Sequence, residues 1–306
     1  VRPGDLLAHY QDTGVRCFQV PRFSIQRKFS VGQWKEVFDS MSRIAREEPT
    51  VIYCNQIADT PVGALLRGSH RVNRLVCHLR LPPPETRQLN QIGLSARKVD
   101  RFIVANLNMK EAWSNWGIEA KRISIVPNAF VIDDYQALSY EGPKNDILRI
   151  GYLGRIAESK GVHVAIESVA KLNQSGHRCH LYIGGKPFPE GESVYLERLN
   201  RLIREFNIAD CVTFLGHVGE RTSFFEKIDV LLFPSLWNEP FGRVLVESIL
   251  SNRPVIANDV GSVREILSEG AKSWIYSTTD ELERTLRQFP SSWKEYPLDA
   301  MRESMV

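Results

Sequence analysis

Two glutamates in the last third of the chain are spaced so that they can serve a single ligand. Glu239 and Glu247 flank the sequence PFGR at 240–243, and seven residues separate them. We expect Glu239 to lie in a loop and Glu247 to follow two helical turns later, so that both carboxylates face one crevice. The alternative is a carboxylate near a helix N-terminus and a solvated surface glutamate.

The residues between the two glutamates predict an anion site. An apolar run stops at Pro234 and an amphipathic stretch begins after Pro240, so the Phe241-Gly242-Arg243 step opens a helix. Unpaired N–H groups and the helix dipole favour an anion there, and Gly242 lets a phosphate approach the main chain. This short segment therefore offers two carboxylates and a binding site for a phosphate.

A second phosphate-binding candidate is the sequence GYLGRIAESKG at 151–161. Gly154 ends a strand, Arg155 can present a planar fork to phosphate oxygens, and Lys160 adds a point charge. The sequence matches neither a P-loop nor the G-x-G-x-x-G fingerprint, so neither ATP hydrolysis nor hydride transfer is predicted. Alone, both cations would be ordinary surface residues; their place at a strand end opposite Glu239 favours binding.

These residues must be positioned by alternating strands and helices. Such alternation is typical of parallel sheets covered on both faces, and it occurs in both halves of the 306-residue chain. We therefore predict an α/β fold of two doubly wound, Rossmann-like domains, 1–135 and 136–306, that face a cleft, with a linker at 128–143. The expected strands are 15–20, 50–54, 74–79, 101–105, 123–127, 148–153, 179–184, 212–215, 229–233, 254–257 and 273–276, and the expected helices of the first half include 31–45 with Ser30 as cap, 61–68, 85–97 and one ending at Trp116.

Composition narrows the class of protein. Apolar residues make up 43% and charged residues 25%, as in ordinary globular proteins, and no apolar run reaches membrane-spanning length. The five cysteines form no C-x-x-C or His/Cys cluster, which favours small buried hydrophobes in a reducing compartment over disulfides or zinc ligands. We therefore expect a cytoplasmic protein.

Charge divides unevenly along the chain. Residues 1–135 carry 19 Lys and Arg against 13 Asp and Glu, whereas residues 136–306 carry 20 against 23. Arg67, Arg71, Arg74 and Arg80 are close in sequence and could meet an anionic lipid surface at the inner membrane face or an anionic acceptor; the alternative is a solvated basic face. The basic residues lack interleaved aromatics, so nucleic acid is not an expected partner.

In combination, these motifs resemble the family 4 (group 1) retaining glycosyltransferases of the GT-B fold. The matching pieces of the second half keep their order and spacing from 151 to 266, and the first half resembles the acceptor-side domain more loosely. The pieces are G-x-x-G-R-x4-K-G at 151–161, VTFLGHV at 212–218, LLFPS at 231–235, the two glutamates around PFG, RPVIANDVGSVREI at 253–266, VCHL at 76–79, FIVANLNMKEAW at 102–113 and IVPNAF at 125–130.

The resemblance implies transfer of a sugar from a nucleoside-diphosphate donor, with retention of the anomeric configuration. Negative charge would build on the departing diphosphate, stabilised by Arg155, Lys160 and the N–H groups around Gly242. Glu247 would hold the ribose hydroxyls, and Glu239 would contact the sugar hydroxyls. The acceptor would be a glycan, a glycolipid or a small molecule.

The resemblance also assigns roles outside this segment. His78 would face the reacting carbon from the first domain, although a lone histidine at a strand end is more often structural. Gly216, His217 and Val218 would lie near the base, although His217 could simply cap a turn. No D-x-D pair occurs, and Asp133 and Asp134 are adjacent in the linker, so we predict metal-independent transfer with no cofactor besides the donor.

Some features depart from the family pattern. The first strand and the glycine-rich loop after it are expected before Val1, Arg243 stands where the family often has an aliphatic residue, and the chain stops before a helix that commonly crosses back onto the first domain. The N-terminal domain is therefore expected to be incomplete. Two alternatives stay open: a nucleotide-sugar epimerase or hydrolase on the same scaffold, and a non-catalytic homologue that binds nucleotide sugar.

Overall fold

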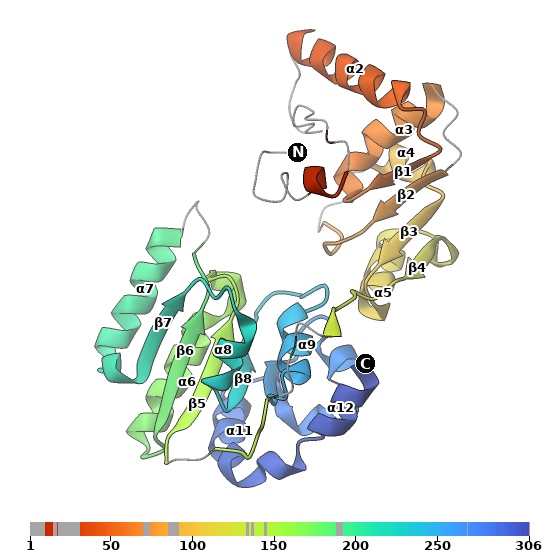
Figure 1. The fold of residues 1–306 in the computed structure, drawn as a ribbon. Helices are drawn as coiled ribbons and strands as arrows, with labels where there is room; N and C mark the ends of the chain where they lie inside the picture. Colours follow the sequence, from red (N-terminus) through yellow and green to blue (C-terminus); the bar gives the residue numbers. More distant parts are fainter. Residues whose placement is uncertain are drawn as a thin grey trace. The chain divides into compact units, whose positions relative to one another are not determined.

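The computed structural model describes residues 10–14, 17, 31–69, 74–84, 92–132, 135, 138–143, 146–187, 192–267 and 269–305. Two compact units make up the chain, Val1–Pro127 and Asn128–Val306 (Figure 1). Most of the predicted strand at 15–20, the predicted cap Ser30, the cation Arg71, and residues 85–91 of a predicted helix lie outside the described residues.

The first unit contains a four-stranded parallel sheet in the order β1-β2-β3-β4. Helices follow the strands as the sequence predicted, although helix α4 is described only from Ile92. The strands are β1 (Val51–Cys54), β2 (Arg74–His78), β3 (Arg101–Val104) and β4 (Ile123–Ile125), and the helices are α2 (Val31–Arg46), α3 (Thr60–Ser69), α4 (Ile92–Arg97) and α5 (Leu107–Trp116).

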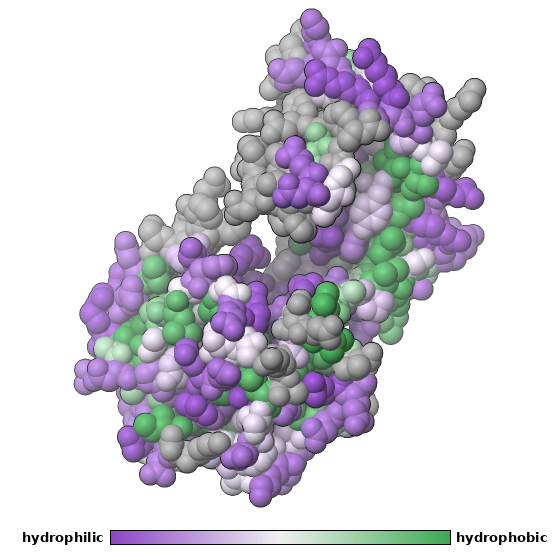
Figure 2. All heavy atoms as spheres, in the orientation of Figure 1, coloured by the Kyte–Doolittle hydropathy of each residue, from purple (hydrophilic) through white to green (hydrophobic). Residues whose placement is uncertain are grey.

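Alternate residues of these strands form the core of the first unit, because successive side chains of a strand point to opposite faces. Leu75 and Cys77 of β2 and Phe102 and Val104 of β3 are fully buried. Asn106 caps α5 by accepting a hydrogen bond from the backbone N–H of Met109 at 2.9 Å. Helix α2, in contrast, is largely covered by hydrophilic residues on the face drawn in Figure 2.

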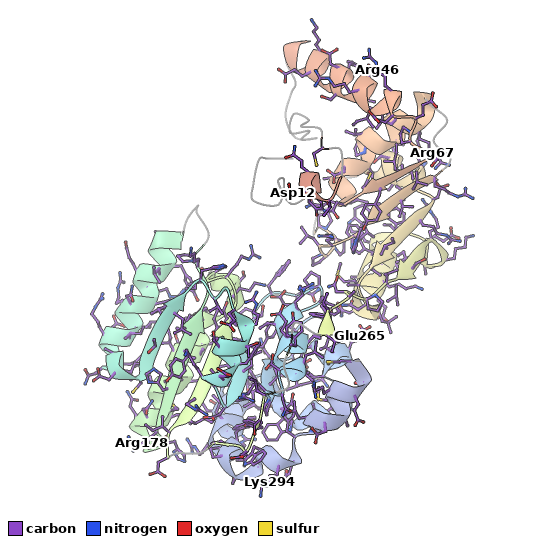
Figure 3. All side chains as sticks on the ribbon, in the orientation of Figure 1. Asp12, Arg46, Arg67, Arg178, Glu265 and Lys294 are labelled. Atoms are coloured by element: carbon purple, nitrogen blue, oxygen red, sulfur yellow. The ribbon has the colours of Figure 1, made fainter. Side chains whose placement is uncertain are left out.

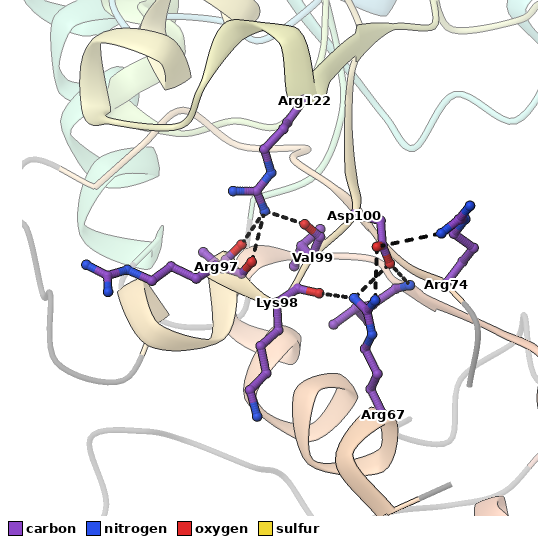
Figure 4. Close-up of polar contacts among 9 residues, drawn as sticks. Arg67, Arg74, Arg97, Lys98, Val99, Asp100 and Arg122 are labelled. Atoms are coloured by element: carbon purple, nitrogen blue, oxygen red, sulfur yellow. Dashed lines mark hydrogen bonds and ion pairs between the residues drawn. The ribbon is translucent and has the colours of Figure 1, made fainter. Parts of the chain in front are cut away.

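Two arginines fasten the turn 97–100 that leads into β3 (Figure 4). Arg67 donates to both carboxylate oxygens of Asp100, at 2.8 and 3.0 Å, and the same carboxylate accepts the backbone N–H of Leu75 at 2.7 Å. Arg122 donates to the carbonyls of Ala96 and Val99. The turn is therefore held from α3 on one side and from the residue before β4 on the other.

The contacts of Asp100 bear on the prediction that Arg67, Arg71, Arg74 and Arg80 could meet an anionic surface. Of these four arginines, Arg67 is bound to Asp100 and Arg74 lies 4.0 Å from the same carboxylate. Arg67 is therefore engaged within the fold, whereas the Arg74 side chain remains 69% exposed. Arg80 is exposed, as are Arg97 and Lys98 beside the turn.

The second unit contains a six-stranded parallel sheet in the order β10-β9-β8-β5-β6-β7. All six predicted strands are present, so the α/β class with parallel sheets is confirmed. The strands are β5 (Leu148–Leu153), β6 (Cys179–Gly184), β7 (Val212–Gly216), β8 (Val230–Phe233), β9 (Val255–Asn258) and β10 (Ile275–Tyr276), and the main helices are α6 (Val162–Gln174), α7 (Glu192–Glu205), α8 (Arg221–Glu226), α9 (Arg243–Leu250), α10 (Val263–Ile266), α11 (Thr279–Ser292) and α12 (Leu298–Met305).

The order of strands reverses between β5 and β8. After β5 the chain moves outward to β6 and β7, and after β8 it moves in the other direction to β9 and β10. The loops that follow β5 and β8 therefore part in opposite directions, which opens a crevice at the carboxyl ends of these strands. Strand β8 is completely buried, and Ile150 of β5 is also inaccessible to solvent.

The remaining side chains are distributed as in an ordinary globular domain. Charged residues such as Arg46, Arg178 and Lys294 are exposed and point away from the sheets (Figure 3).

All five cysteines are free thiols, and burial raises the pKa of Cys54 and of Cys179 to about 12, which makes both unreactive. Among the helices that the structure describes, none is long and apolar enough to span a membrane.

Replacing Asp100 with Asn tests the Arg67 network. Burial alone would raise the pKa of Asp100, but the Leu75 N–H and the Arg67 guanidinium outweigh it and hold this pKa below its usual value. We expect the variant to lose about 1–2 kcal/mol of unfolding free energy at pH 7 in urea titrations. The difference should begin to shrink near about pH 4 and vanish once the pH is below the depressed pKa, because the carboxyl group stabilises the fold only while it is ionised.

The exposed pair Lys121–Glu119 supplies the matched control. Its side chains are 77% and 54% exposed, so Glu119→Gln should change the unfolding free energy by less than about 0.5 kcal/mol. Equal losses of unfolding free energy in Asp100→Asn and Glu119→Gln would show that the Asp100 contacts stabilise the fold no more than an exposed ion pair does.

Candidate functional site

Three loops meet at the carboxyl edge of the second sheet, after β5, β8 and β9. The loop after β8 is held on one side by the loop after β5, because the backbone N–H of Leu236 donates to the Ser159 carbonyl at 2.9 Å. On the other side, the Asn258 amide donates to the Ser235 carbonyl and the Ser262 hydroxyl donates to the Pro240 carbonyl, both at 2.8 Å. The predicted segment 234–242 is thus fixed from both neighbouring strands.

Two glycines allow these loops to touch. Gly161 has φ +69°, and a Cβ at this position would lie 1.9 Å from the Pro234 carbonyl oxygen. Gly261 has φ +57°, and a Cβ there would lie 2.2 Å from the carbonyl oxygen and 2.6 Å from the nitrogen of Glu239. A side chain at either position would separate the loops, so glycine is required for their contact.

The loops enclose a pocket of about 440 Å³ at the switch between β5 and β8. Eight of the twelve residues predicted for the site line it, and the four predicted residues that do not are His78 and the group Gly216, His217 and Val218. The eight lining residues are Gly154, Arg155, Lys160, Glu239, Phe241, Gly242, Arg243 and Glu247.

Lys160 and Glu239 form a buried ion pair at one side of the pocket. The Lys160 ammonium donates to Oε1 of Glu239, and the Ser235 hydroxyl donates to the same oxygen at 3.0 Å. The two side chains are only 14% and 10% exposed, and the ammonium also lies 5.1 Å from the Trp237 ring centroid. Both contacts use Oε1, so Oε2 of Glu239 is the oxygen that can accept a hydrogen bond from a ligand hydroxyl.

Glu247 lies at the other side of the pocket, on the first turns of α9. Its carboxylate is 7% exposed and sits between the Nε atoms of Arg221 and Arg243, at 3.6 and 3.7 Å. These distances neutralise the charge but exceed normal hydrogen-bond lengths, so the carboxylate keeps acceptor capacity. Arg221 was not predicted from the sequence. It lies beyond the motif at 212–218, at the start of a six-residue helix, and only the fold brings it beside Glu247.

The pocket is positively charged. Arg155, Lys160, Arg221 and Arg243 line it, against the two glutamates that some of them pair with. Helix α9 begins at Arg243, and its cap Gly242 has φ +71°, so the first N–H groups of the helix add positive potential at this point. The arrangement suits a ligand with a dianionic or more highly charged centre and hydroxyl groups on either side of it.

His78 is the last residue of β2 in the first unit, as predicted. Its Nδ1 lies 2.6 Å from the Tyr53 hydroxyl, which leaves Nε2 as the ring nitrogen that can reach a ligand. Burial, reinforced by Arg80, lowers the pKa of His78, so the imidazole is neutral at pH 7. Tyr53 was not singled out in the sequence, because only the pairing of β1 with β2 brings it beside His78.

The three residues expected near the base lie at the end of β7: Gly216 is its last residue, and His217 and Val218 follow it. The Gly216 carbonyl accepts the backbone N–H of Gly185 at 2.7 Å, so this strand end is fastened to the end of β6, two strands away from the pocket walls at β8. His217 is exposed, and Val218 packs toward Gly184. Their predicted contact with a base stays a prediction.

A family model matches the part of the chain that contains the pocket. Residues 140–302, more than half of the chain, match the model for glycosyl transferases group 1. The chain belongs to this family.

Curated relatives resemble part of this chain. The α-D-kanosaminyltransferase of Streptomyces kanamyceticus is 31% identical over 121 residues, which is 39% of this chain and 30% of the relative. The D-inositol 3-phosphate glycosyltransferase of Stackebrandtia nassauensis is 33% identical over 148 residues, 46% of this chain and 32% of the relative. The chain spans about a third of the length of the curated relatives it matches.

Solved structures of glycosyltransferases share the whole fold. HepE of Anabaena, in a complex with UDP and glucose, matches with a TM-score of 0.79 and 21% identity, over 99% of this chain and 84% of that chain. A glycosyltransferase of Rickettsia africae matches with a TM-score of 0.81 and 14% identity, over 99% of this chain and 83% of that chain. The fold is therefore of the GT-B type.

Within the described residues, no group of three His, Cys, Asp or Glu side chains is arranged to hold a metal ion. The predicted carboxylate pair Asp133 and Asp134 lies outside those residues. Metal-independent transfer stays a prediction, and so does the absence of a cofactor.

Gly261→Ala tests whether close loop contact maintains this pocket. The new methyl group must displace Glu239, in a backbone conformation that alanine disfavours, so we expect a loss of about 1–3 kcal/mol in urea unfolding. Gly219→Ala is the matched control, since a Cβ there meets nothing within 4 Å. Similar unfolding curves for both variants would contradict the proposed role of Gly261.

Proposed function

We propose that this chain is a retaining glycosyltransferase, which moves a sugar from a nucleoside-diphosphate sugar to a glycan, glycolipid or small-molecule acceptor. One observation carries the proposal: Arg155, Lys160 and the N-terminus of α9 converge in a pocket that also holds two buried carboxylates. The family supports it, and so does the likeness in fold to a protein whose structure holds UDP and glucose.

The chemistry matches this set of groups. The bond between the anomeric carbon and the diphosphate oxygen breaks, a bond to the acceptor oxygen forms, and the acceptor proton passes to the departing diphosphate. Negative charge grows on the diphosphate as the sugar becomes oxocarbenium-like, so cations and N–H groups that face it stabilise the transition state more than the ground state. Arg155, Lys160 and the amides around Gly242 have this role in our proposal.

The two carboxylates orient the donor. Glu247 accepts hydrogen bonds from the ribose hydroxyls, and Glu239 accepts one from the sugar through Oε2. Because Lys160 pairs with Glu239, one residue of the pair binds the diphosphate while the other binds the sugar, and the ion pair fixes the distance between the two subsites. His78 is the proposed catalytic residue of the first unit, as a neutral imidazole that donates from Nε2 to a sugar hydroxyl.

Nucleotide binding can be tested by thermal stabilisation with UDP, GDP, TDP and ADP and their sugar conjugates. One nucleotide series should raise the melting temperature, because a ligand at 100 times its Kd adds about 2.7 kcal/mol of stability. Glu247→Gln should reduce this shift, whereas Glu197→Gln on the exposed face of α7 should preserve it. A wild-type protein that responds to none of these compounds would contradict the proposal.

The reaction itself has two expected properties. Turnover should continue in excess EDTA and should not increase with Mg²⁺ or Mn²⁺, because the cations of the pocket supply the charge that a metal would otherwise supply. The first-formed product, followed by proton NMR, should have the same anomeric configuration as the donor. Loss of activity in EDTA that Mg²⁺ or Mn²⁺ restores would refute metal independence, and an inverted product would refute retention.

A lipid-linked or anionic acceptor would bring the first unit close to a charged surface. The exposed cations Arg80, Arg97 and Lys98 are candidates for this contact. Sedimentation with vesicles that contain 30% anionic lipid, on the order of the charge of an inner leaflet, should recover the protein at low salt and lose it at high salt. Equal recovery with neutral vesicles would argue against electrostatic membrane contact.

A further inference from the structure

The described residues 128–132 and 135, at the start of the second unit, lie against the pocket. In Figure 1 this yellow-green segment passes beside α9. The ring of Phe130 stacks on the ring of Phe241, with centroids 6.1 Å apart and an interplanar angle of 27°. The guanidinium carbon of Arg243 lies 4.7 Å from the centroid of the Phe130 ring. Phe130 therefore contacts the residues on both sides of Gly242, the cap of α9.

A second aromatic residue of the segment completes this contact. The rings of Tyr135 and Phe130 meet edge to face, with centroids 6.1 Å apart. Burial and the nearby Glu247 carboxylate raise the pKa of Tyr135, while a hydrogen bond to Arg243 opposes that shift, so its hydroxyl lies among the charges of the pocket. We call Phe130, Tyr135, Phe241 and Arg243 the linker cluster.

Arg243 needs such support. Its side chain is 56% exposed, and its Nε is 3.7 Å from the Glu247 carboxylate, a distance that does not by itself fix the guanidinium. A long exposed side chain retains much rotamer freedom unless its neighbours restrict it. The Phe130 ring and the hydrogen bond with Tyr135 restrict it, and the Glu247 carboxylate lies on its other side. An arginine held in this way is suited to bind an anion.

We propose that Phe130 is a positioning residue of the donor pocket, which holds Phe241 and Arg243 so that the first turn of α9 and the Arg243 guanidinium face the diphosphate. This role rests on the proposed function. The start of the second unit then serves the donor site, and Phe130 acts on the ligand through Arg243 rather than by touching it.

Calorimetric titration of four proteins tests this role. The wild type, Phe130→Leu, Arg243→Met and the double variant are titrated with UDP, GDP, TDP and ADP. Phe130→Leu should weaken the binding of the nucleotide that the wild type prefers about fivefold, the effect of losing one exposed cation–π contact. Phe130→Tyr should restore the affinity, because its ring presents a similar face. In the Arg243→Met background, Phe130→Leu should have little further effect.

The outcomes separate this proposal from a purely structural role. Unchanged affinity in Phe130→Leu, with a lower melting temperature of the free protein, would show that Phe130 only anchors the segment and would overturn the proposal. Losses that simply add in the double variant would overturn the route through Arg243. A wild type that binds none of the four nucleotides would overturn the proposed function, and the positioning role with it; the wild-type titration therefore tells the two failures apart.

Discussion

The ion pair between Lys160 and Glu239 is the constraint on which the candidate site depends. Both side chains are nearly buried, and a buried charge without its partner costs about 3–5 kcal/mol, which is a large share of the stability of a domain. Lys160 follows β5 and Glu239 follows β8, so the pair requires the two loops on either side of the topological switch to stay together. Gly161 and Gly261 make this possible, because they let the backbones approach more closely than any side chain would allow.

The surrounding contacts follow from that constraint. Once the loop after β8 is fixed, Gly242 sets the start of α9, and the helix places Glu247 between two arginines in the same pocket. The paired carboxylates limit how much of the positive charge is exposed, yet the cations still exceed the carboxylates in the lining. The pocket can therefore attract an anion and still bind hydroxyl groups, which a pocket lined by cations alone would do poorly.

Much of this could be predicted from the sequence, because the signals are local. Apolar runs such as LRIGYL and VLLF located the strands, and the PFG step located the start of α9. The partners that chain topology brings together could not be predicted in the same way. The sequence around Arg67 does not indicate its partner, because Asp100 lies 33 residues away and only the fold brings the two together. Phe130 and Tyr135 were assigned to a linker, since nothing in their neighbourhood of the sequence indicates that they contact Phe241 and Arg243.

The proposed function depends on binding of the donor diphosphate by the N-terminus of α9 and the loop after β5. The most direct test is a titration of amide resonances by NMR, in which the preferred nucleoside diphosphate is compared with the corresponding nucleoside. We expect the amide resonances of Gly242, Arg243 and Arg155 to shift with the diphosphate and hardly to move with the nucleoside. Shifts of the same size with both ligands, or shifts confined to residues outside the pocket, would contradict it.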